Sequence, residues 1–223
     1  MKILRKLYKK FFPDPSEFFS DKIVNQSYKS LLMVGTPLDG GFGSGVLLKS
    51  NKIITASHNF ANTPAKKAMI ISPSSGEISA VKSTKMDKNT DLTILTLRTH
   101  FKSPCAKIDL TSERGEGYYP VLMPVFFDPL NVEKLANEEL SDCFEQLAHF
   151  GFAGAFETNV RMVDGSYRLR SIFSLCSTYG YSGAGIYNQK GELLTLDTGG
   201  NHREASGPSI QTFRDFIKKH DLA

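Results

Sequence analysis

The chain has 223 residues, of which 40% are hydrophobic and 22% are charged, and its formal net charge at pH 7 is +4. This length suits one globular domain or one two-lobed domain, and the composition is close to the globular average, which excludes disorder over the whole length. The charge excess comes largely from the first ten residues, so the remaining body is near neutral and nucleic acid is not expected as a partner.

Residues 1–28 are interpreted as a basic N-terminal extension. Charges interrupt every apolar run in it, which does not fit a standard secretory signal peptide. The chain contains no run of about 18 apolar residues, so no transmembrane helix is expected. We therefore expect either a cytoplasmic protein or one exported without such a signal. Residues 1–12 could form a short amphipathic helix that weakly contacts anionic lipid or a partner. The preferred alternative is a frayed basic tail that ends at Pro13 and Pro15.

Two series of short apolar or alternating segments, separated by turn residues, predict β-strands. Short strands at this spacing indicate an all-β barrel or sandwich, and the two series indicate two lobes that meet near residues 109–115. The first lobe would comprise residues 29–110 and the second residues 111–223. The predicted strands are 31–36, 45–48, 52–55, 68–71, 78–81 and 92–97, then 147–151, 159–163, 168–174, 185–187 and 192–197.

Two segments depart from the β pattern. Residues 129–146 are acidic and carry apolar side chains at loosely helical spacing, which predicts a helix-bearing insertion that could cover a cleft or bind a partner. Residues 208–222 predict an amphipathic C-terminal helix, for which Ser209 is a suitable N-cap. The residues on its apolar stripe are Ile210, Phe213, Phe216 and Ile217.

The three cysteines, Cys105, Cys143 and Cys176, are odd in number and far apart, with no metal-binding spacing such as C-x-x-C. We therefore expect free thiols rather than a disulfide framework.

Three short motifs carry the residue types of nucleophilic catalysis. They are GFGSGVLLKSNKIITASH (41–58), DLTIL (91–95) and STYGYSGAG (177–185). A serine such as Ser182 is a weak nucleophile until a base takes its proton, and imidazole is the usual base. His58 follows one apolar strand and Asp91 precedes another, so the carboxylate could orient the imidazole. Each residue also has a plainer interpretation: a core or capping histidine, a turn aspartate and a glycine-rich bend.

A glycine two residues before the nucleophile can turn its N–H outward. The N–H groups of Gly180 and Ser182 would then point at one place, where they could stabilise a developing oxyanion.

Taken in order, these motifs resemble those of the chymotrypsin/trypsin-like serine protease family, in particular its bacterial trypsin-like and HtrA-like peptidase domains, from about residue 29 to the C-terminus. The resemblance implies two antiparallel six-stranded β-barrels with a C-terminal helix. His58 and Asp91 would lie on the first barrel and Ser182 on the second. It also implies a serine endopeptidase that cleaves a protein or peptide substrate through an acyl-enzyme, without a metal or another cofactor.

The resemblance also implies a substrate-binding set. By offset from Ser182, Cys176 would occupy the base of the specificity pocket, with Ser177 beside it and Gly199 on its wall. The segment that ends with Asp197, Thr198 and Gly199 would pair with the substrate backbone. Because Cys176, Ser177 and Gly199 are uncharged, a small or apolar residue is expected before the cleaved bond rather than lysine or arginine.

The chain departs from the family pattern at several positions. Tyr181 replaces an acid or amide and cannot pair with a freed N-terminal amine, so we expect no trypsin-style activation. Ala184 replaces a glycine. Asp197 stands where a serine or asparagine usually contacts the triad aspartate. A second carboxylate near Asp91 would disfavour ionisation of one of the two, unless Asp197 points away from it.

Two other functions remain open. An α/β-hydrolase esterase also places its serine in G-x-S-x-G, but Ala184 occupies the position of the last glycine, and a strand rather than a helix is predicted after Ser182. A catalytically degenerate protease fold that serves as a binding or scaffold module would explain the unusual Tyr181, Ala184 and Asp197. The presence of all three triad residue types argues against it.

Overall fold

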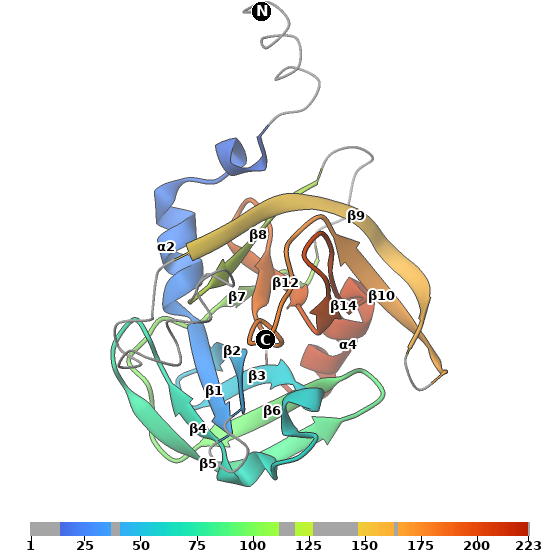
Figure 1. Cartoon of the computed structure of the whole chain (residues 1–223). Coiled ribbons are helices and arrows are strands. Elements are labelled where there is room, and N and C mark those ends of the chain that lie inside the picture. Colours follow the sequence, from blue (N-terminus) through green and yellow to red (C-terminus); the bar gives the residue numbers. More distant parts are fainter. Residues whose placement is uncertain (1–13, 37–40, 112–118, 127–146, 163–164, 223) are drawn as a thin grey trace, which may run out of the picture.

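The computed structural model of the chain describes residues 14–36, 41–111, 119–126, 147–162 and 165–222. Its strands form two lobes, the first of which is a closed barrel with strand order β1-β2-β3-β6-β5-β4 (Figure 1). The barrel strands are β1 (Leu31–Thr36), β2 (Gly41–Lys49), β3 (Lys52–Ala56), β4 (Met69–Ile71), β5 (Ile78–Asp87) and β6 (Leu92–Leu97).

Strands β1 and β6 have the predicted bounds, whereas β2 and β5 are longer than the sequence suggests. The added residues are the glycine- and serine-rich start of β2 and the polar second half of β5, which carry little apolar signal. They are strands because β1 and β6 supply hydrogen-bonding partners along their length.

The second lobe is an eight-stranded sheet with the order β13-β14-β10-β9-β8-β11-β12-β7. The all-β class and the two-lobed architecture are therefore confirmed. The strands are β7 (Lys107–Ile108), β8 (Pro120–Val125), β9 (Leu147–Arg161), β10 (Tyr167–Phe173), β11 (Gly185–Tyr187), β12 (Glu192–Leu196), β13 (Gly199–Gly200) and β14 (Ala205–Pro208).

This sheet curls until β12 and β14 lie against each other, where the second six-stranded barrel implied by the resemblance would close. The Thr195 hydroxyl donates to the Pro208 carbonyl at 2.9 Å, and the Thr198 N–H donates to the Ser206 carbonyl at 2.9 Å. A Cβ on Gly207 would lie 2.0 Å from the Leu196 carbonyl oxygen, so this close approach requires a glycine. β12 and β14 are not paired as neighbours in the sheet, whose two edge strands are β7 and β13, so they do not form a continuous ladder.

The prediction of two strands at 147–151 and 159–163 is wrong, because one long strand, β9, spans Leu147–Arg161 and pairs with both β8 and β10. Gly151 and Gly154 suggested a break in the sequence. Gly151 instead lets the chain pass close to Ser174, whose carbonyl oxygen would lie 2.1 Å from an added Cβ. Strand β8 was not predicted, since Pro120 and Pro124 are unusual within a sheet.

Part of the predicted basic extension is folded onto the second lobe. The short helix η1 (Pro15–Phe18) contacts β9, and the helix α2 (Asp21–Lys29), which the sequence analysis missed, lies beside β8 (Figure 1). Ile23 and Val24 of α2 pack against a buried apolar cluster. Residues 1–12 and the predicted insertion 129–146 lie outside the described residues, as do 112–118, so the division at residues 110 and 111 stays a prediction.

The predicted C-terminal helix is α4 (Ile210–Lys219), which buries Ile210, Phe213, Phe216 and Ile217. Arg214 links it to the segment between the lobes by donating from Nη2 to the Asp109 carboxylate at 2.9 Å and from Nε to the Asp109 carbonyl at 2.9 Å. Both side chains are largely buried, so each charge has a partner where water is excluded.

Replacing Ser209 with alanine is expected to lower the free energy of unfolding by about 1 kcal/mol. Its buried hydroxyl oxygen caps α4 by accepting from the Thr212 N–H at 3.2 Å, and alanine leaves that donor without its partner. Urea denaturation would measure the change, with the exposed Gln211→Ala of the same helix as the matched control. Equal midpoints for the two variants would show that the cap contributes nothing.

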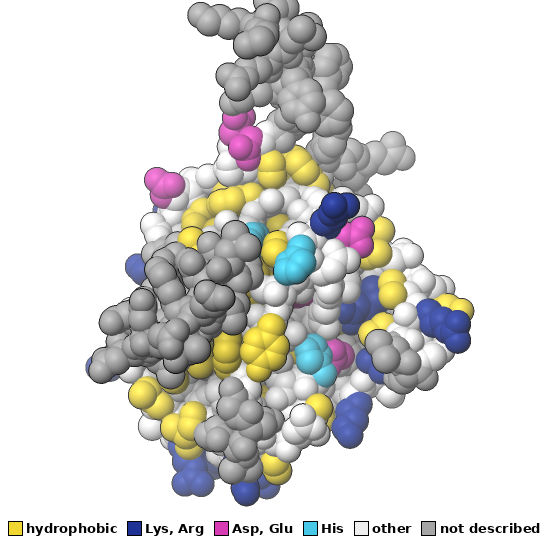
Figure 2. Space-filling model, in the orientation of Figure 1, with side chains coloured by type: hydrophobic (Ala, Val, Ile, Leu, Met, Phe, Trp, Pro, Cys, Tyr) yellow, Lys and Arg dark blue, Asp and Glu magenta, His cyan; other side chains and the backbone are white. Residues whose placement is uncertain are grey.

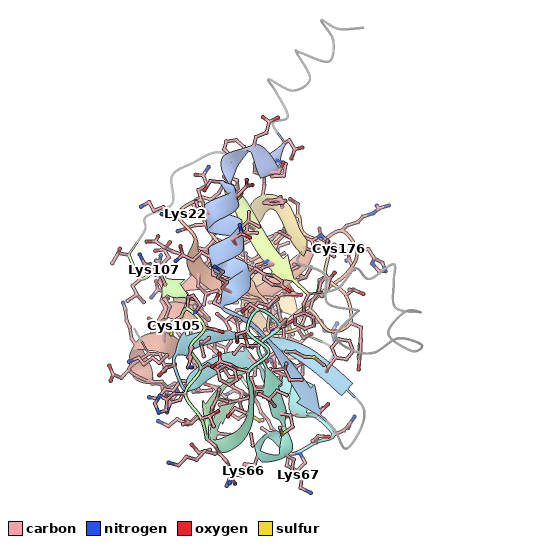
Figure 3. All side chains as sticks on the ribbon, turned by 90° about the vertical axis from the view of Figure 1, so that its left-hand side faces the viewer. Lys22, Lys66, Lys67, Cys105, Lys107 and Cys176 are labelled. Carbon is pink, nitrogen blue, oxygen red and sulfur yellow. The ribbon has the colours of Figure 1, made fainter. Side chains whose placement is uncertain are left out.

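Cys105 and Cys176 lie far apart and are not joined to each other by a disulfide (Figure 3). Cys143 lies outside the described residues. Within the described part of the chain, no helix is both long and apolar enough to cross a membrane.

Candidate active site

His58 is placed by the short helix η2 (Ser57–Phe60), which begins where β3 ends. Two hydrogen bonds from backbone N–H groups fix this turn against the loop before β6. The Ser57 N–H donates to the Asp91 carbonyl at 3.0 Å, and the His58 N–H donates to the side-chain Oδ1 of Asp91 at 3.0 Å. The imidazole remains accessible, with 44% of its side-chain surface exposed.

Asp91 sits at the mouth of β6, as the sequence predicted. Its φ of 59° is in the left-handed region, which is unusual for a residue other than glycine. The residue is 8% exposed, and its Oδ2 lies 2.8 Å from His58 Nδ1. A carboxylate can only accept, so Nδ1 carries the proton and Nε2 of the neutral ring is left as an acceptor.

Ser182 completes the set, because its Oγ lies 2.8 Å from His58 Nε2. The structure thus brings the three predicted residues into one line of hydrogen bonds, Asp91 to His58 to Ser182. Asp91 and His58 come from the first lobe and Ser182 from the second. In this arrangement the neutral imidazole can take the hydroxyl proton of Ser182.

The turn that carries Ser182 is held by both lobes. Its carbonyl accepts from the Ser44 N–H at 2.9 Å and from Asn59 Nδ2 at 2.9 Å. The next N–H, of Gly183, donates to the Asp197 carbonyl at 2.6 Å. Gly183 has a φ of 98°, and a Cβ there would lie 2.0 Å from the Ser44 carbonyl oxygen, so the contact between the lobes depends on a glycine.

The peptide groups around Gly180 and Ser182 are oriented by neighbouring bonds. The Gly180 carbonyl accepts from Ser44 Oγ at 2.8 Å, and the Tyr181 carbonyl accepts from the Ala184 N–H at 2.7 Å. A trans peptide points its carbonyl and N–H in opposite directions, so the Ser182 N–H faces away from Ala184. No acceptor among the described residues binds the N–H of Gly180 or Ser182. Both residues line a cleft beside His58, so their N–H groups are candidates for an oxyanion site.

Tyr181, between these two donors, is fully buried in the apolar core of the second lobe. Its hydroxyl lies 3.2 Å from Nε2 of His149 on β9. The side chain therefore anchors the loop in the core without an ion pair. His149 was not predicted, because nothing in the sequence connects it with a residue 32 positions away.

Asp197 does not bond to Asp91, and its carboxylate is instead held by Ser177 and Gly199. Its carboxylate is fully buried; Oδ2 accepts from Ser177 Oγ at 2.7 Å, and Oδ1 accepts from the Gly199 N–H at 3.2 Å. The structure thus joins three of the predicted substrate-binding residues to one another. Cys176 is half-buried beside them, and Thr198 is buried.

Arg170, a buried arginine that the sequence analysis missed, places its positive charge near the carboxylates of Asp91 and Asp197. Burial raises the pKa of Asp197 to about 6, against the opposing effects of the Ser177 and Gly199 hydrogen bonds and of the charges of Arg170 and His58. Arg170 is 2% exposed, and burial lowers its pKa while Asp91 and Asp197 oppose that change. Its guanidinium is held by bonds from Nη2 to the carbonyl and hydroxyl of Ser206, at 2.9 and 3.0 Å.

Two clefts open on either side of His58. The larger has a volume of about 730 Å³ and is lined by Thr198 and Asp91 among others. The smaller, of about 310 Å³, contains Ser182 and Gly180 together with the rings of Phe42 and Tyr179, which meet edge to face with centroids 5.3 Å apart. Among the described residues no cluster of histidine, cysteine and acidic side chains could hold a metal ion.

Sequence comparison finds no family model that matches the chain and no matching curated protein. Solved structures do match, and they include crystal structures of Rv3671c from M. tuberculosis. The structure of the Rv3671c protease in an inactive form matches with a TM-score of 0.70 at 13% identity, over 93% of this chain and 96% of the other. The active form has a TM-score of 0.70 at 14% identity, over 93% and 87%. The chain therefore has the chymotrypsin-like fold of the trypsin-like serine proteases.

Proposed function

We propose that this chain is a serine endopeptidase that hydrolyses peptide bonds through Ser182, His58 and Asp91. The observation that carries the proposal is the pair of 2.8 Å contacts that join Asp91 Oδ2 to His58 Nδ1 and His58 Nε2 to Ser182 Oγ. A buried carboxylate, an accessible imidazole and a serine on a rigid turn are the groups that acyl transfer needs.

In the proposed reaction, Ser182 Oγ attacks the substrate carbonyl while His58 Nε2 takes the hydroxyl proton. Asp91 keeps Nδ1 protonated and stabilises the imidazolium. The N–H groups of Gly180 and Ser182 donate to the oxyanion, and each such donor typically contributes about 10²–10³-fold to the rate. His58 then gives its proton to the leaving amine, and water, activated by the same imidazole, hydrolyses the acyl-enzyme.

The two clefts would bind the parts of the substrate that lie on opposite sides of the cleaved bond. The segment that ends at Thr198 and Gly199 is the one implied to pair with the acyl part of the substrate. The larger cleft, which Thr198 lines, would therefore receive residues on the amino side of the bond. The smaller cleft, with Tyr179 and Phe42, would receive the leaving part. The Gly199 N–H already donates to Asp197, so backbone pairing there would have to displace or share that bond.

Two assays on purified protein test the proposal. Incubation with an unfolded protein should yield new peptides, and p-nitrophenyl acetate should release a burst of about one nitrophenol per enzyme as the acyl-enzyme accumulates. Ser182→Ala should lose both signals. Ser83→Ala, an exposed serine on β5, should keep them. Cleavage that persists in Ser182→Ala would refute the assignment, and a folded protein with neither signal would favour the binding or scaffold module.

A further inference from the structure

The larger cleft combines an adaptable apolar floor with two cationic side chains, Lys88 and Arg168. It lies between η2 and the end of β5 on one side and the β9–β10 hairpin on the other. Its lining residues are Ser57, His58, Phe60, Ala61, Met86, Lys88, Asp91, Met162, Arg168 and Thr198.

The apolar part of the cleft comes from both lobes. Phe60 is buried beneath it, and the side chains of Met86 and Met162 border it. Met86 is 40% exposed, so it can bury more of its surface when a ligand arrives. Methionine is unbranched and polarisable and packs against varied apolar shapes. This part of the cleft therefore suits a large apolar side chain.

The charged lining residues are mostly cationic. Lys88 is exposed in the turn after β5, and Arg168 is half-buried on β10. The one acidic lining residue, Asp91, uses both carboxylate oxygens on His58. Next to Lys88, Asp87 Oδ1 accepts from the N–H groups of the turn that follows it. Figure 2 shows that lysine and arginine side chains lie among hydrophobic ones on the face of the molecule in that view.

From this combination we propose that the enzyme prefers substrates with a large apolar side chain next to an acidic one on the amino side of the cleaved bond. Lys88 and Arg168 at the edge of the cleft attract a carboxylate and repel a cation. The apolar side chain would occupy the floor around Met86 and Met162. This inference rests on the proposed function and adds the substrate class.

Three fluorogenic peptides that differ at one position test the preference. In each peptide, leucine occupies either the second or the third residue on the amino side of the cleaved bond. The other of these two positions carries glutamate, glutamine or lysine. At low ionic strength we expect kcat/KM for the glutamate peptide to exceed that for the lysine peptide by about tenfold, as two partly exposed charge pairs allow. The ratio should fall as salt is added. Equal rates for the three peptides would overturn the inference.

The double variant Lys88→Glu, Arg168→Glu should reverse the order, so that the lysine peptide is cut fastest. A misfolded variant cannot produce such a reversal. The control is Lys22→Glu, Lys107→Glu, which changes the net charge equally at exposed lysines on another side of the molecule (Figure 3). It should keep the glutamate preference. If the reversal occurs in the control, or the preference survives in the cleft variant, the cleft does not set it.

The nitrophenyl ester burst separates the two possible failures. The ester is too small to reach the charged edge, so a wild-type burst without any charge preference would refute the substrate class alone. Absence of both the burst and peptide cleavage in the wild type would refute the proposed function and the preference with it.

Discussion

Replacing His58 with alanine is expected to reduce the rate of peptide or ester hydrolysis by about 10⁵–10⁶-fold. Among the described residues, His58 is the base that contacts Ser182 Oγ, so its loss leaves the hydroxyl without a proton acceptor from this part of the chain. His100→Ala, at an exposed histidine bonded to Ser50, is the matched control and should retain wild-type rates. Thermal unfolding would confirm that both variants are folded. A His58→Ala rate within tenfold of the wild type would contradict the proposed chemistry.

Asp91→Asn tests the orienting carboxylate in the same assay, with an expected loss of about 10⁴-fold. The amide oxygen can still accept from the His58 N–H, so the turn should persist. The amide nitrogen, however, would face Nδ1 as a donor and favour the tautomer with its proton on Nε2. That tautomer cannot accept the proton of Ser182. An unchanged rate would show that Asp91 only fixes the backbone.

Replacing Asp197 with asparagine is expected to raise the free energy of unfolding at pH 7.5 by up to about 3 kcal/mol. Burial raises the pKa of this carboxyl from 3.8 to about 6, and each pKa unit corresponds to about 1.36 kcal/mol. The folded state therefore holds the proton more tightly than the unfolded state. Its stabilising contribution is complete below pH 3.8 and is lost as the pH rises through about 6.

Asparagine fits the same site without the charge. Its oxygen can accept from the Gly199 N–H, and its amide can donate to Ser177 Oγ, which rotates to accept. Urea denaturation at pH 4 and at pH 7.5 should show similar stabilities at the lower pH and a gain for Asp197→Asn at the higher. Asp215→Asn, at an exposed carboxylate of α4, is the charge-matched control. Parallel pH profiles for wild type and Asp197→Asn would refute the account of this carboxyl.

The sequence predicted those parts of the fold and site whose signal is local. β1 and β6 could be predicted from short segments rich in apolar residues, and α4 from its amphipathic stripe and its cap at Ser209. His58, Asp91 and Ser182 could be singled out because each lies in a short motif beside a strand. Their meeting at 2.8 Å could only be implied by the resemblance, because it depends on how the two lobes pack.

Features that depend on distant contacts could not be predicted. α2 has a modest apolar face, which becomes informative only where Ile23 and Val24 meet the second lobe. Arg170 reads as an ordinary polar strand residue until burial brings it near Asp91 and Asp197. The orientation of the Asp197 carboxylate could not be predicted from the sequence either, because its hydrogen-bond donors, Ser177 and Gly199, are brought to it only when the chain folds.

Fluorophosphonate labelling followed by intact mass and peptide mapping tests the central claim most directly. These reagents form a stable adduct with a serine whose proton a neighbouring base can accept, and they need no knowledge of the natural substrate. We predict one adduct per folded chain, located on Ser182 and absent from Ser182→Ala. A folded wild-type protein that stays unlabelled, or an adduct that persists in Ser182→Ala, would contradict the assembled triad.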